Sequence, residues 1–470
     1  MSAAAPDALD RIGESLAERA SPIVIKEVRQ GLRTRVFWVF FTLMLIACMV
    51  IALVAFAASA STEAGAGAFG AIFSVLGLVQ FFVIPYSAYR SMAREQEDET
   101  WVLLTLTGLG PRSVIRGKIG SFVLQGVLYA SAAAPFLLFS YYLNGIDLPT
   151  IVAGLVFAAA YQVFLVSVAV SLATVAHSKL MRGLMQFAVL AILLAATGLG
   201  MGASAGLIQL FRRGNFDAEL LFGCCAAVFA MLSTAVLLFE AAAAGLSLTT
   251  ESYARGHRLA YLVQLFGGVA FFIQGWHQMA SSSFLIVGAV LAAVYSTLVG
   301  TYVISDRDGL AANLRAKRSS VFTPGAYRGY LLVAVSLIFA GAVFLALAST
   351  DHDLRSRDLR VIVAAPAFAL FYLSLPQVVA RWLPHAPTQT PAMVRVVSLG
   401  LLVLGMGLPP LVGLLISEPD DKLLNLLNPL LGLVNLSKSS SSSNEAVVLV
   451  WVAAAVAALM ATLSLKRRDT

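Results

Sequence analysis

Long apolar runs alternate with short polar segments along the whole chain. Twelve of these runs have about the length that a membrane-spanning helix requires. Because lipid offers no hydrogen-bond partner to an exposed backbone, each run is expected to be helical. The predicted spans are 37–60, 69–89, 119–142, 150–173, 184–208, 218–244, 259–278, 283–304, 329–349, 360–381, 394–416 and 446–465. The pattern therefore predicts an all-α polytopic membrane protein with about twelve transmembrane helices.

Two regions of this pattern allow a second interpretation. The spans 259–278 and 283–304 are so close that a re-entrant hairpin is the alternative to two crossings. The segment 417–445 has an apolar middle, LLNLLNPLLGLVNL, followed by a run of serines. The apolar part is either an interfacial helix on the outer membrane surface or a helix packed within the loop. The serine run is typical of a flexible linker.

Composition agrees with a membrane protein. The 470 residues are 59% hydrophobic and 12% charged, about half the charge of a typical soluble domain. The formal net charge of +7 resembles that of a nucleic-acid-binding protein, but basic cytoplasmic loops give a membrane protein the same excess. We therefore expect lipid, and no nucleic acid, as a partner.

The distribution of lysine and arginine predicts the orientation. With a cytoplasmic N-terminus, the outer loops carry only seven of the 32 basic residues: Arg212, Arg213, Arg355, Arg357, Arg360, Lys422 and Lys438. This bias predicts an even number of spans and cytoplasmic N- and C-termini. The first 20 residues are polar and the first apolar run is too long for a cleavable signal peptide, so none is expected.

The segment before the first span has an amphipathic pattern. Residues 1–36 are expected to be cytoplasmic, with Ser21 as the cap and Pro22 in the first turn of a helix that reaches Arg35. Its apolar positions share one face: Val24, Val28 and Leu32. Its charged candidates for an interface helix are Lys26, Glu27, Arg29 and Arg33. An ordinary basic flank is the alternative, but it does not explain the apolar stripe.

A polar island from Arg90 to Lys118 separates spans two and three. Nine of its 29 residues are charged. The second span continues into an acidic run, which is followed by a short apolar stretch, a turn ending at Pro111 and the start of the next helix. An apolar stretch exposed to the cytoplasm is a candidate protein contact. The alternative for the acidic run is a solvated helix end.

Several motifs occur in an order that resembles the type 2 ABC exporter permeases. They are SPIVIKEVRQGLRTR, then EQEDET with LLTLTGLG and Gly117-Lys118, and then APFLLFSYYLNGIDL. The resemblance covers about residues 21–250, with weaker support from LLNPLLGL before the last span. The chain departs from the family at Gln96 and Glu99, where arginine and glycine are usual, and at Gly108, where proline is usual.

The resemblance implies a six-helix permease domain over 37–250, with residues 90–118 as a coupling loop that docks on a separate ABC ATPase subunit. The residues implied in docking are Glu95, Glu97, Asp98, Glu99, Thr100, Trp101, Leu103, Leu104 and Leu106. ATP and magnesium would be bound by the ATPase. A homo- or heterodimer of permeases in the cell membrane, a bacterial inner membrane, is expected. Residues 251–470 would form a second membrane domain of about six helices, either diverged or appended.

The chain lacks the motifs of several other classes. GLGPRSVIRGKIGS lacks the glycine spacing of a P-loop and has no Ser or Thr after Lys118, so no ATP hydrolysis by this chain is expected. No HExxH motif or zinc-type Cys/His cluster predicts a metal site or another enzymatic activity. Gly198, Gly200 and Gly202 lie inside a span and predict close helix packing rather than a dinucleotide loop, and Gly202 and Gly206 have the spacing of a G-x-x-x-G motif. Five glutamines are expected to hydrogen-bond between helices: Gln80, Gln125, Gln162, Gln186 and Gln264.

Two further classes remain as alternatives. An ion-coupled secondary transporter needs ionisable residues at membrane depth, and Glu240 near the inner end of span six is the best candidate. We interpret Glu240 as a residue that reaches the interface. A non-transport scaffold or intramembrane enzyme would be expected to hold a paired polar site within the membrane, and the pattern predicts none.

Overall fold

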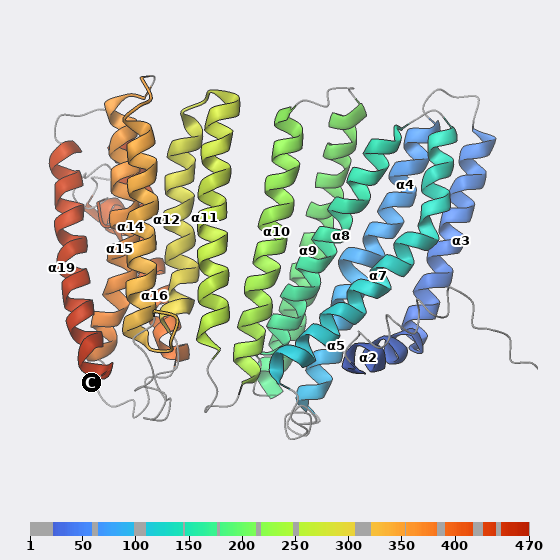
Figure 1. The fold of residues 1–470 in the computed structure, drawn as a ribbon, viewed down its shortest axis with the longest axis horizontal. Coiled ribbons are helices and arrows are strands. Elements are labelled where there is room, and N and C mark those ends of the chain that lie inside the picture. Colours follow the sequence, from blue (N-terminus) through green and yellow to red (C-terminus); the bar gives the residue numbers. More distant parts are fainter. Residues whose placement is uncertain are drawn as a thin grey trace, which may run out of the picture. The chain divides into compact units, whose positions relative to one another are not determined.

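The computed structural model describes residues 22–58, 64–97, 110–143, 146–175, 179–212, 218–247, 253–305, 321–352, 354–382, 391–416, 426–438 and 443–469. All regular structure in these ranges is helical (Figure 1). The helices are α2 (Pro22–Leu32), α3 (Arg35–Ala57), α4 (Ala64–Leu78), the π-helix η1 (Val79–Val83), α5 (Ile84–Glu97), α7 (Pro111–Tyr142), α8 (Leu148–Ala173), α9 (Lys179–Arg212), α10 (Ala218–Leu246), α11 (Ala254–Met279), α12 (Ser283–Ile304), α14 (Ala326–Ala348), α15 (Ser356–Trp382), α16 (Pro391–Ile416), α18 (Pro429–Ser437) and α19 (Ser443–Asp469).

Twelve helical segments among the described residues are long and apolar enough to cross a membrane, which confirms the predicted fold class. The shortest of them have 22 residues, about 33 Å of helix, and the hydrocarbon core is about 30 Å thick. α11 and α12 each meet this requirement, which favours two full-length spans over the re-entrant hairpin.

The chain divides into two compact units, Met1–Ser247 and Leu248–Thr470, close to the boundary expected at 250. In unit 1, α7 and α8 pack on each other, and most of the remaining helices contact one or both of them. In unit 2, α15 is central, because α12, α14, α16, α18 and α19 all pack on it. α15 is also the most buried of the twelve candidate spans, whereas in unit 1 the most buried one is the span over Gly65–Glu97.

The N-terminal helix is shorter than its sequence pattern predicts. α2 ends at Leu32, not at Arg35, and Thr34 begins a separate helix by accepting a hydrogen bond from the Phe37 amide over 3.3 Å. The break allows α2 to lie across the end of α7 rather than to extend α3 (Figure 1). The predicted apolar positions Val24, Val28 and Leu32 are all partly buried, and Lys26, Arg29 and Arg33 are exposed, which confirms the amphipathic pattern.

The second span is interrupted by a π-helical turn. α4, η1 and α5 form a continuous helix of 33 residues over Gly65–Glu97, so the second span does continue into the island as predicted. Within the turn, the buried Gln80 donates from Nε2 to the Gly126 carbonyl of α7 over 3.2 Å. Such turns often occur at functional sites, and this one fixes the membrane half of the helix to α7.

Among the residues described, four of the five predicted glutamines connect helices, and Gln80 in the π-helical turn is one of them. Gln162 of α8 donates to the Phe122 carbonyl of α7 over 3.0 Å, and Gln186 of α9 donates to the Tyr86 hydroxyl over 3.2 Å. In unit 2, Gln264 accepts from the Tyr295 hydroxyl over 3.1 Å. Each contact joins two helices through a polar group that lipid could not satisfy.

Of the glycines in α9 that were predicted to pack closely on another helix, Gly200 does so within the described chain, and the G-x-x-x-G pair does not. A Cβ built on Gly202 or Gly206 would meet nothing within 4 Å. The closely packed residue is Gly200, where a Cβ would lie 2.4 Å from a ring carbon of Tyr161. The spacing alone could not identify the residue that faces the neighbouring helix.

The apolar segment before the last span contains the short helix α18, whose start is capped by Asn428. The Asn428 Oδ1 atom accepts from the amides of Leu430 and Leu431, and its Nδ2 donates to the Met406 carbonyl over 2.7 Å. Leu436 is buried on one side of α18, and Leu430 is 52% exposed on another. α18 therefore is a loop helix packed on unit 2, with an apolar face left outside.

Candidate functional site

A buried lysine lies where three helices of unit 1 meet. Lys118, two turns into α7, is 1% exposed. Its Nζ atom lies 2.6 Å from Glu95 Oε1 of α5, 3.3 Å from Glu27 Oε2 of α2 and 3.0 Å from Ser91 Oγ of α5. We call these four residues the Lys118 cluster.

The local structure explains how these side chains meet. Pro111 is the first residue of α7, after the Gly110 cap, as the island pattern predicted. Ser91 and Glu95 are four residues apart, so they share one face of α5 and can reach one cation together. Glu27 comes from α2, which packs against α7. Each helix therefore contributes through its ordinary geometry.

The cluster satisfies the hydrogen-bonding capacity of its cation. An ammonium group has three N–H donors, and Lys118 has one acceptor for each of them. The two carboxylates are partly buried, with side-chain exposures of 11% for Glu27 and 20% for Glu95. A charge buried this deeply requires such partners, because an unpaired one would cost several kcal/mol, on the order of 5.

A second ion pair links the start of α7 to another helix of unit 1. Arg112 donates from Nη2 and Nε to the same Oε2 atom of Glu240 in α10, over 2.7 and 3.0 Å. Glu240 is therefore paired near a helix end, which agrees with its interpretation as an interface residue. Arg112 is 40% exposed, so this pair stabilises the fold by only about 1 kcal/mol or less.

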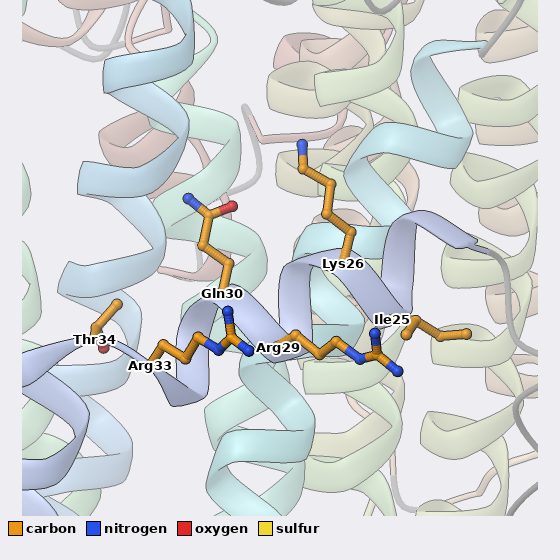
Figure 2. Close-up of a pocket in the computed structure, with 6 residues that line it drawn as sticks. All are labelled: Ile25, Lys26, Arg29, Gln30, Arg33 and Thr34. Atoms are coloured by element: carbon orange, nitrogen blue, oxygen red, sulfur yellow. The ribbon is translucent and has the colours of Figure 1, made fainter.

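The exposed face of α2 is strongly basic. Figure 2 shows Lys26 and Gln30 projecting from one side of the helix, with Arg29 and Arg33 lying along it. These residues line an open groove of about 520 Å³ together with Ile25 and Thr34. The predicted interface residues Lys26, Arg29 and Arg33 thus face outward, and the fourth, Glu27, turns inward to the Lys118 cluster.

The structure locates two of the predicted docking residues. Glu95 belongs to the Lys118 cluster, and Glu97 is exposed at the end of α5. The others lie outside the described residues: Asp98, Glu99, Thr100, Trp101, Leu103, Leu104 and Leu106.

The burial of Lys118 was not predicted from the sequence, because a lysine at the start of a span is typical of an ordinary basic flank. A usable signal was present in the acidic residues on both neighbouring segments, Glu27 and Glu95. A second missed cation is Arg258 in unit 2, which is fully buried. Its guanidinium donates to backbone carbonyls of the loop before α14: Val321, Thr323 and Gly325.

Comparison with known proteins gives no relative for this chain. No protein-family model, no curated protein and no solved structure matches it. The site is therefore interpreted from its own residues.

Proposed function

We propose that this chain is the membrane subunit of an ABC exporter, driven by a separate ATPase that docks on the loop between α5 and α7. The observation that carries the proposal is the Lys118 cluster. It joins the helix before that loop to the helix after it, and it joins both to the amphipathic helix α2. The motif order that resembles the type 2 permeases supports the same assignment.

A loop that transmits force needs rigid attachments on both sides. Here α5 ends at Glu97, two residues after Glu95, and α7 begins at Pro111, two turns before Lys118. A displacement applied to the loop would move α2, α5 and α7 together, because separating them would leave the buried Lys118 ammonium without its acceptors. The Arg112–Glu240 pair would extend the displacement to α10.

The first test is co-purification with a partner ATPase. Trp101→Glu and Leu104→Glu place a charge in the apolar part of the loop and are expected to abolish co-purification. Val175→Glu is the matched control. Val175 is an apolar residue just after α8 and is 53% exposed. Like the loop between α5 and α7, it is predicted to lie on the cytoplasmic side. If the complex survives both loop substitutions, or if the control disrupts it equally, the docking proposal is wrong.

The second test separates the proposed exporter from an ion-coupled transporter. In proteoliposomes containing the complex, substrate movement should require ATP and should persist when ionophores collapse the ion gradients. Movement that follows an ion gradient without ATP would contradict the proposal. The buried charges of unit 1 are paired near helix ends, which favours the first outcome.

A further inference from the structure

A cavity of about 1100 Å³ lies between α2, α3, α5 and α7, beside the Lys118 cluster. α3 and α5 both pack on α7, but among the described residues they make little or no direct contact with each other. The space between them has α7 as its back wall and α2 along one end. Its volume is at the upper end of the range for small-molecule sites.

The lining of the cavity changes from aromatic to cationic along η1 and α5. Phe82, Tyr86, Arg90 and Arg94 line it at intervals of four residues, so they form one stripe about 18 Å long. Phe82 and Tyr86 stack, with ring centroids 6.2 Å apart. The apolar part of the stripe lies toward the middle of the span, and the two arginines lie toward its end.

The other walls follow the same division. α3 contributes Val36, Phe37 and Phe40, and α7 contributes Phe122 and Tyr129. α2 adds a cation at the polar end through Lys26, beside Gln30 (Figure 2). The cavity is thus apolar at one end and basic at the other.

In the described part of the chain, the basic end of the cavity carries more positive than negative charge. The lining carboxylates, Glu27 and Glu95, are both held by Lys118. Among the described residues, no carboxylate forms an ion pair with Lys26, Arg90 or Arg94. Three cations beside an apolar space of this size match an anionic headgroup with an attached acyl chain.

We propose that this cavity binds an anionic glycerophospholipid, with the phosphate at Lys26, Arg90 and Arg94 and an acyl chain among the aromatic side chains. Val36 is 50% exposed at the edge of the cavity, so a chain can enter from the surrounding lipid between α3 and α5. Because Glu27 and Glu95 also line the cavity, a bound lipid would hold α2 and α5 in the arrangement that the Lys118 cluster requires. The inference does not depend on the proposed function.

The test measures lipid binding to the purified full-length chain by native mass spectrometry from neutral detergent. The probes are phosphatidylglycerol and phosphatidylcholine with identical acyl chains, with glycerol phosphate and inorganic phosphate as chainless competitors. Phosphatidylglycerol is expected to bind at least about fivefold more tightly than phosphatidylcholine. One cation near the membrane surface contributes about 1 kcal/mol to the binding of an anionic lipid, which corresponds to this factor. Neither competitor should displace it.

Two kinds of variant localise the site. The double variant Lys26→Gln/Arg90→Gln should abolish the preference for phosphatidylglycerol. The double variant Arg29→Gln/Arg33→Gln removes the same number of positive charges outside the cavity and should retain the preference. Arg90 and Arg94 also line a smaller cavity together with Arg182, so a second variant that leaves all charges in place is needed to localise the site.

Val36→Trp fills the entrance and should weaken binding of both lipids, and Val39→Trp is its matched control. Val39 is 54% exposed on the same helix and does not line the cavity. Equal binding of the two lipids, an unchanged Val36→Trp variant, or equal losses in test and control variants would overturn the proposal. Displacement by inorganic phosphate would overturn it as well, by identifying a site for a free anion.

Discussion

Replacing Lys118 by methionine tests the central contact of unit 1. Methionine keeps the length and most of the volume of the lysine side chain but removes its charge. Glu27 and Glu95 would then remain close together and partly buried, with exposures of 11% and 20%, and without their shared cation. The substitution therefore leaves two carboxylates in need of a counter-charge.

The magnitude follows from the distances. At 2.6 and 3.3 Å, and with an effective dielectric constant of about 20, the two attractions amount to roughly 6 and 5 kcal/mol. Desolvation of the three charged groups offsets most of this, because the penalty is several kcal/mol per ion. The measured cost of removing one partner from a buried ion pair is about 3–5 kcal/mol, and we expect Lys118→Met to lower the free energy of unfolding by that amount.

The assay is reversible unfolding in mixed micelles, with the free energy of unfolding extrapolated to zero denaturant. Arg116→Met is the matched control, because Arg116 is an exposed cation two residues earlier on α7, and we expect it to cost less than about 0.5 kcal/mol. Adding Glu27→Gln and Glu95→Gln to Lys118→Met removes every charge of the cluster and should restore most of the loss.

The reasoning about the cluster would be refuted by any of three results. The first is a Lys118→Met protein within about 1 kcal/mol of the wild type. The second is a loss of equal size in Arg116→Met. The third is a triple variant that is no more stable than Lys118→Met, since the loss would then not arise from uncompensated carboxylates.

Two further predictions concern unit 2. Gly329→Ala should lower the free energy of unfolding by about 1–3 kcal/mol, because its Cβ would lie 2.7 Å from the backbone oxygen of Val303. Gly268→Ala, where a Cβ meets nothing within 4 Å, should instead raise it by up to about 1 kcal/mol, and an equal effect at both glycines would contradict the packing argument. Arg258→Met should lower the free energy of unfolding by about 3 kcal/mol or more, because it leaves three backbone carbonyls without a donor and each costs about 1–3 kcal/mol. The exposed Arg255→Met should stay within about 0.5 kcal/mol of the wild type in the same unfolding assay; a similar loss at both arginines would show that the buried hydrogen bonds are not the cause.

The spans could be predicted from the sequence because one physical requirement dominates them. A backbone in lipid must satisfy its own hydrogen bonds, so hydropathy and length suffice to locate helices such as α11 and α12. The end of α2 could not be predicted in the same way. The pattern continues to Arg35, but the Thr34 side chain forms a cap that ends one helix and starts the next, and this depends on the path of the chain in space.

The Lys118 cluster needed the tertiary structure for a different reason. Glu27 and Lys118 are 91 residues apart, and no sequence spacing indicates that α2 crosses α7 at this point. Sequence reasoning correctly placed Glu27 on an amphipathic helix and Glu95 on the helix that continues from the second span into the island. It could not show that both would turn toward the same lysine, because burial is decided by the neighbouring helices.

The two units bind their buried cations differently, and the difference bears on where an ATPase would act. In unit 2, Arg258 donates to carbonyls of a single loop, so these hydrogen bonds hold that loop against the start of α11. In unit 1, Lys118 is satisfied by side chains of two other helices. Only the second arrangement makes three separate helices move together when one of them is displaced. Between these two cations, the one suited to transmit a displacement therefore lies in unit 1, beside the loop that we propose as the docking site.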